Sequence, residues 1–178
     1  MTEIFDQQEP VAKSAKSITL TYGLVTALAM IVLSLVLLFL DLGTKSWLNY
    51  LIYLIYAIGV FLACRAFTAS RNGFVTFGNV FGAGFRMVAF TTLLMVVWSI
   101  ISIYVFPEIK DKALQEAQIQ MLENGTSEEQ IEMGLEMTRK FFTPVLIMGA
   151  VFSYLIVGVV FSLLSAAIVK KNKIQTPF

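Results

Sequence analysis

Charged residues leave four long stretches of the chain without any formal charge. These stretches contain 24, 19, 21 and 29 residues and run over 17–40, 46–64, 87–107 and 141–169. About 20 helical residues cross the hydrocarbon core of a bilayer, and a helix satisfies its own backbone hydrogen bonds there. The sequence therefore predicts an all-α membrane protein with four transmembrane helices, at approximately 17–40, 46–64, 87–107 and 143–169.

The composition agrees with a membrane location. Only 14% of the residues are charged and 57% are hydrophobic, whereas a soluble domain carries about 25% charge. At 178 residues we expect a single membrane domain over 1–178. The chain has no histidine and one cysteine, Cys64, which excludes histidine-based catalysis, the usual zinc and haem ligation, and an internal disulfide. We expect no catalytic residue, no metal and no cofactor.

The basic residues predict an orientation. Eight Lys and Arg residues lie in the N-terminal tail, the 65–86 segment and the C-terminal tail, and five lie on the opposite side. Because cytoplasmic segments carry the excess of basic residues, both termini are predicted to be cytoplasmic. The net charge of +1 provides no basic surface for nucleic acid.

A segment rich in glycine and phenylalanine, residues 73–86, precedes the third stretch. Its phenylalanines would form one stripe on a helix, which predicts an amphipathic cytoplasmic segment before span 3. Gly78 and Gly82 have the four-residue spacing that lets helices approach closely, and Gly158 and Ser162 repeat it in the fourth stretch. Contact of a basic side chain with lipid headgroups is an alternative, and phosphate binding is disfavoured because no Lys-Ser/Thr pair follows the glycines. The candidates for helix packing or interaction are Gly78, Gly82, Gly84, Arg86, Gly158 and Ser162.

The polar residues 108–142 are expected to form an extracytoplasmic helical hairpin between spans 3 and 4. Asn124-Gly125 would end its first helix, and Thr126 with Glu129, or Ser127 with Gln130, would cap the second. Each helix would have about 15 residues and a length of about 22 Å.

The second helix of this hairpin would carry an acidic outer face. That face consists of Glu128, Glu129, Glu132 and Glu136. A solvated surface is one interpretation of it, and a site for a cation or a basic partner is the other.

Two functions are compatible with these features. The first is a non-enzymatic accessory or interaction subunit, whose partners would be the lipid bilayer and either a second copy or another envelope membrane protein. The alternative is a small transporter or channel for an uncharged or lipid-like solute, because the stretches contain no charged residue of the kind that marks ion pathways. The residues that could line such a path are Thr19, Thr21, Tyr22, Thr26, Ser34, Tyr53, Tyr56, Ser99 and Ser102. An enzyme acting on a lipid-linked substrate is a third interpretation and would depend on the four glutamates.

Several short motifs resemble those of a known family. They are Thr76-Phe77-Gly78 with Phe81 and Gly84-Phe85, the acidic run from Asn124 to Glu129, and Phe141 to Pro144. Together they resemble the domain of unknown function 4199 family. The resemblance implies a small four-span inner-membrane protein of Bacteroidota with a place in the cell envelope. It implies no catalytic residue.

Overall fold

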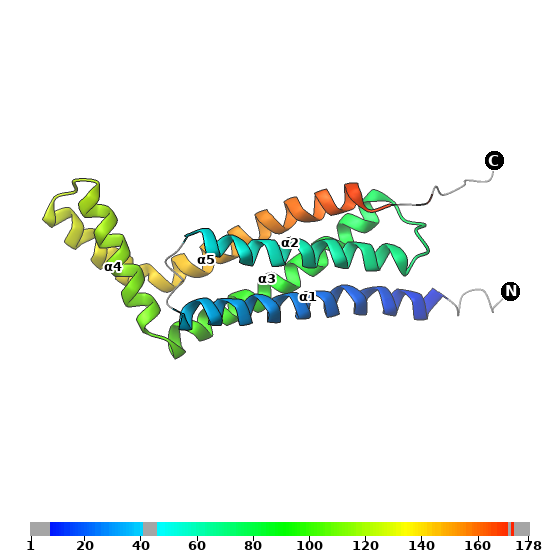
Figure 1. The fold of residues 1–178 in the computed structure, drawn as a ribbon, viewed down its shortest axis with the longest axis horizontal. Coiled ribbons are helices and arrows are strands. Elements are labelled where there is room, and N and C mark those ends of the chain that lie inside the picture. The colour runs from blue at the N-terminus through cyan, green and yellow to red at the C-terminus, as the bar shows by residue number, and fades with distance from the viewer. Residues whose placement is uncertain (1–7, 41–45, 171, 173–178) are drawn as a thin grey trace. The chain divides into compact units, whose positions relative to one another are not determined.

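The computed structural model describes residues 8–40, 46–170 and 172. These residues form five helices and no strand (Figure 1): α1 (Gln8–Phe39), α2 (Ser46–Ala69), α3 (Phe77–Val105), α4 (Glu108–Glu123) and α5 (Glu128–Ile168). Four segments are long and apolar enough to cross a membrane: Ser17–Phe39, Tyr50–Ala69, Phe77–Val105 and Glu128–Ile168. The prediction of an all-helical chain with four candidate membrane spans is confirmed.

The segment predicted to lie before span 3 is part of the spanning helix. α3 begins at Phe77 and runs without interruption to Val105. The Thr76 hydroxyl accepts a hydrogen bond from the backbone N–H of Asn79 at 3.3 Å, which satisfies one of the free donors in the first turn. Since residues 77–86 contain no proline, nothing separates the phenylalanine-rich turns from the apolar turns that follow.

The polar residues before the fourth stretch form one helix with it. α4 ends at Glu123, and Gly125 has a φ of +72°, so the chain breaks at Asn124-Gly125 as predicted. α5 then continues from Glu128 to Ile168 with Pro144 inside it. Proline removes one backbone donor but can be accommodated within a long helix, and the expected second helix of about 15 residues is therefore the first part of α5.

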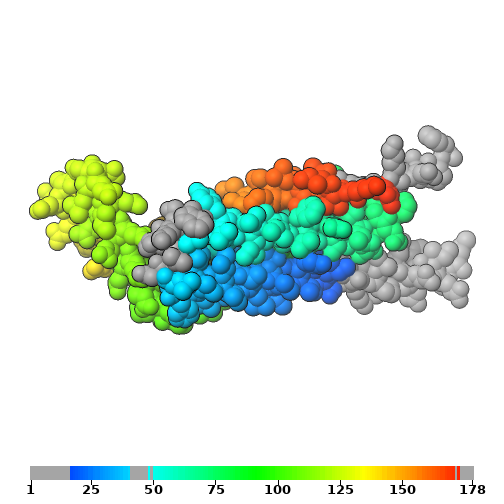
Figure 2. Space-filling view, in the orientation of Figure 1, coloured from blue at the N-terminus to red at the C-terminus, as the bar shows by residue number. Residues whose placement is uncertain are grey.

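The chain divides into two compact units, and α3 and α5 each contribute to both. Unit 1 comprises Met1–Leu94 and Ser153–Phe178, and unit 2 comprises Met95–Phe152. In unit 1 the helices alternate in direction, so that the start of α1, the loop between α2 and α3, and the end of α5 lie at one end (Figure 1). Figure 2 shows α1, α2 and the last part of α5 side by side on one face of this unit.

Small side chains lie in the interior of unit 1 beside larger ones such as Met30 and Tyr56. Ala27, Ala63 and Ala83 are fully buried, whereas large apolar residues such as Val25 and Ile156 are exposed. Helices associate in lipid through small residues, because burying large apolar side chains brings little gain there. The buried polar residues of the described chain are Thr19, Thr26, Thr68, Thr91, Thr92, Ser162 and Ser165.

Unit 2 contains α4 and the first part of α5, which contact each other. Leu114 of α4 and Ile131 of α5 are buried. A Cβ added at Gly134 would lie 3.0 Å from Cε of Met121, so the two helices approach closely at that point. The Nζ of Lys110 lies 5.8 Å from the ring centroid of Phe142, within the range of a cation–π contact.

Candidate functional site

Three helices of unit 1 meet at Gly84. A Cβ added there would lie 2.9 Å from Sγ of Cys64 on α2 and 3.1 Å from Cβ of Ser162 on α5. The Ser162 hydroxyl donates to the carbonyl oxygen of Phe81 at 3.1 Å, and the Cys64 thiol donates to that of Val80 at 3.8 Å. Two of the predicted packing residues, Gly84 and Ser162, are thus brought together. α3 can lie this close to α2 and α5 only because residue 84 is a glycine, with a hydrogen atom in place of a side chain.

A second close contact surrounds Gly158 and Tyr56. A Cβ at Gly158 would lie 2.9 Å from Cγ2 of Val88 and would also meet the Tyr56 hydroxyl. That hydroxyl donates to the carbonyl oxygen of Tyr154 at 3.2 Å, and the two tyrosine rings pack edge to face at 6.0 Å. The Thr92 side chain is also buried. Interhelical packing is therefore tight around Gly158 and Tyr56.

Gly78, Gly82 and Arg86 lie elsewhere on α3. Nothing lies within 4 Å of a Cβ built at Gly82, and at Gly78 only the Thr76 hydroxyl comes as close as 4.0 Å. Arg86 is exposed. Within the described chain the Gly78/Gly82 pair is thus not part of a close helix contact. Its role in helix packing stays a prediction.

The hydroxyls considered for a solute path are used mainly in backbone hydrogen bonds. Thr21 donates to the carbonyl of Ser17, and Ser99 donates to that of Met95, both at 2.9 Å and within one helix. The same pattern holds for Ser34 and Ser102. Thr19, Thr26 and Tyr56 are buried, Tyr22, Tyr53, Ser34, Ser99 and Ser102 are half-buried, and Thr21 is exposed. The set is therefore spread over inner and outer faces.

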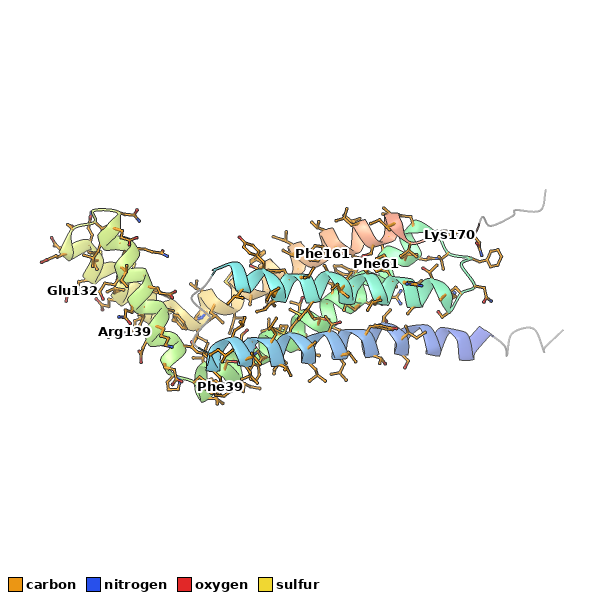
Figure 3. The ribbon with its side chains drawn as sticks, viewed as in Figure 1. Phe39, Phe61, Glu132, Arg139, Phe161 and Lys170 are labelled. Atoms are coloured by element: carbon orange, nitrogen blue, oxygen red, sulfur yellow. The ribbon has the colours of Figure 1, made fainter. Side chains whose placement is uncertain are left out.

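The first turns of α5 carry an acidic row and an apolar stripe. Glu128, Glu129, Glu132 and Glu136 are all exposed, and Figure 3 labels Glu132 together with Arg139 on this part of the helix. Beside this row, Met133 and Met137 are each 61% exposed and Phe141 is 51% exposed. The apolar stripe, Met133–Met137–Phe141, was not predicted, although its four-residue spacing was visible in the sequence.

An apolar cavity of about 620 Å³ adjoins the apolar stripe in unit 2. Ile109 and Ala113 of α4 line it, together with Met137, Phe141 and Val145 of α5. Its volume lies within the range of small-molecule and lipid-chain sites. Sequence alone does not predict this cavity, because its walls come from two helices, α4 and α5, and form only when these pack together.

The class of this protein follows from its helices, and its family follows from a comparison with models of known families. Four apolar helices that are long enough to cross a bilayer define a small multi-pass membrane protein. The family model described as "Protein of unknown function (DUF4199)" matches residues 21–171, and the chain belongs to this family, as its motifs predicted. Neither the comparison with curated proteins nor the comparison with solved structures found a match.

Proposed function

We propose that the protein is a non-enzymatic accessory subunit of the bacterial inner membrane that binds another envelope membrane protein through the apolar stripe of α5. The exposure of Met133, Met137 and Phe141 carries this proposal. α5 has 41 residues, which makes it about 62 Å long, twice the roughly 30 Å of hydrocarbon that it has to cross. The first turns of α5 therefore extend into water, where an apolar stripe gains free energy from being covered.

Methionine and charge both favour a protein as the occupant of this stripe. The flexible, polarisable side chains of Met133 and Met137 adapt to different apolar partners. Burying one such side chain contributes about 1.5–3 kcal/mol. The adjacent Glu132 and Glu136 would attract Lys or Arg at the rim of the contact, whereas they would repel the same row of a second copy in a symmetric contact. This complementarity supports a basic-rimmed partner over self-association.

Site-specific crosslinking tests this proposal. A photo-crosslinking amino acid at Met137 is expected to give one discrete adduct with a membrane protein in native membranes, while the same residue at Gln118, exposed on α4, gives none. Met133→Lys should abolish the adduct from position 137 without lowering the unfolding temperature. A purely lipid adduct, an adduct with a second copy of this chain, or equal adducts at both positions would contradict the proposal.

The proposed topology has α4 and the start of α5 outside the cytoplasm, and the loop between α2 and α3 inside it. The native Cys64 is fully buried, so single cysteines can be introduced into the unaltered chain. In intact cells, Asn124→Cys is expected to react with a membrane-impermeant thiol reagent, and Phe74→Cys is expected to react only after permeabilisation. Wild-type protein is the unlabelled control, and the reverse pattern would overturn the orientation.

The alternative of a small transporter receives less support from the structure. Its candidate hydroxyls donate mostly to backbone carbonyls, as Thr91 also does by donating to Gly23 of α1 at 3.2 Å. Whether they lie within one helix or between two, such bonds use up the donors that a polar solute would need. We therefore favour the accessory subunit.

A further inference from the structure

A cavity of about 480 Å³ lies at the end of unit 1 where α2 and α5 finish. Its lining includes Phe61, Arg65, Thr68, Asn72, Ile168 and Lys170. The candidate spans end at Ala69 and Ile168, which places the cavity at the boundary between hydrocarbon and water. Figure 3 labels Phe61 on α2 and Lys170 just beyond α5, beside the loop that joins α2 to α3.

The charge of this cavity is entirely positive. Arg65 and Lys170 line it, and no carboxylate does so among the described residues. Both side chains are exposed, and neither makes an ion pair or a hydrogen bond within the described part of the chain. Two uncompensated cations at a membrane boundary attract an anion, and phosphate is the anion that lipid headgroups present there.

The wall of the cavity is held in place by Asn172. Its backbone N–H donates to the carbonyl oxygen of Gly73, and its side-chain Nδ2 donates to that of Asn72, each at 2.8 Å. Asn72 and Gly73 have φ values of +51° and +78°, the left-handed region that glycine and asparagine adopt most readily. The segment after α5 is thus fastened to the loop after α2, which keeps Lys170, just beyond α5, at the same cavity as Arg65 of α2.

The lining also contains apolar side chains, beside the polar Thr68, Asn72 and Asn172. Phe61 and Ile168 belong to the spanning parts of α2 and α5. The Thr68 hydroxyl donates to the carbonyl of Cys64 at 2.9 Å, so the donor atoms left for a ligand are those of Arg65, Lys170 and the loop. Polar groups on the water side and apolar groups on the lipid side match an amphiphile with a charged head.

We propose that this cavity binds a phosphate-bearing anion, with Arg65 and Lys170 contacting the phosphate and an anionic phospholipid supplying it. The lipid chains would lie along Phe61 and Ile168. A volume of about 480 Å³ falls within the range of small-molecule sites and accommodates a headgroup. The phosphate could also come from a water-soluble ion, which the experiment below distinguishes.

Titration of the purified full-length protein with lipid, followed by native mass spectrometry, tests the assignment. Phosphatidylglycerol is expected to bind at least tenfold more tightly than phosphatidylcholine. Arg65→Gln and Lys170→Gln should each weaken phosphatidylglycerol binding about fivefold, the contribution expected of one basic residue near an anionic headgroup. Arg65→Lys should retain most of the affinity, and Arg139→Gln, an exposed arginine in unit 2, should leave it unchanged.

Three results would overturn this assignment. Equal binding of the two lipids would exclude a charge-reading site, and an equal loss in Arg139→Gln would show that only net charge matters. Inorganic phosphate is expected not to displace phosphatidylglycerol at millimolar concentration. Displacement would identify the soluble ion as the occupant and remove the lipid assignment. Unfolding temperatures measured in phosphatidylcholine show that each variant is folded.

Discussion

Gly84→Leu is expected to destabilise unit 1 by about 3 kcal/mol or more, the upper part of the range for overpacking a core. The new side chain would enter the space between α2 and α5, where even a Cβ lies 2.9 Å from Sγ of Cys64. Because Ser162 is held by its bond to Phe81, it cannot move away without losing that bond. Gly84→Ala should have a smaller effect of the same sign.

The matched control is two residues away on the same helix. A Cβ at Gly82 meets nothing within 4 Å, so Gly82→Leu should change the unfolding free energy by less than about 0.5 kcal/mol. Both variants can be compared by unfolding in sodium dodecyl sulfate and by the fraction that stays monodisperse after heating in mild detergent. Equal losses at positions 82 and 84 would show that α3 does not pack as described.

Tyr56→Ala is expected to cost about 3–5 kcal/mol, because it removes one of the largest fully buried side chains of unit 1. The ring packs edge to face against Tyr154 and against Phe161, with centroids 6.0 and 6.3 Å apart. Tyr56→Phe keeps the ring and loses only the bond to the Tyr154 carbonyl, which in a membrane helix contributes about 0.6 kcal/mol on average.

This pair of variants separates packing from hydrogen bonding at one site. Tyr50 is on the same helix and 70% exposed, so Tyr50→Ala serves as the control and should have little effect on unfolding in detergent. If Tyr56→Phe were as destabilising as Tyr56→Ala, the hydroxyl would be the main source of stability, and the packing account would be wrong.

The four spans could be predicted because the absence of charge is a local property of the chain. Some helix boundaries carry a clear local signal, such as the Thr76 hydroxyl at the start of α3 and the break at Asn124-Gly125. Pro144 gives a similar signal but lies inside α5. The ends of the helices were therefore harder to predict than the spans. A proline costs one backbone hydrogen bond. The polar helical segment before Pro144 and the apolar one after it are both long, and the helix stays continuous across the proline.

The four-residue spacing of small residues does not by itself predict which of them contact another helix. Gly78, Gly82 and Gly158 all have the same four-residue pattern, yet only Gly158 contacts neighbouring helices in the described chain. Which face of a helix meets its neighbours depends on the other helices, and this is why Gly84 rather than Gly82 occupies the close contact. Arg65 and Lys170 each end an uncharged stretch, but only the fold brings them to one cavity.

The interior of unit 1 should respond little to the voltage across an energised membrane. Among its described residues, the buried polar side chains are threonine and serine, which are dipoles without net charge. A transmembrane potential does work on a protein only by acting on charge, about 2.3 kcal/mol per elementary charge for each 100 mV. Packing around Gly84 and Tyr56 should therefore be equally stable in energised and de-energised cells, and voltage would act only on charged groups elsewhere in the chain.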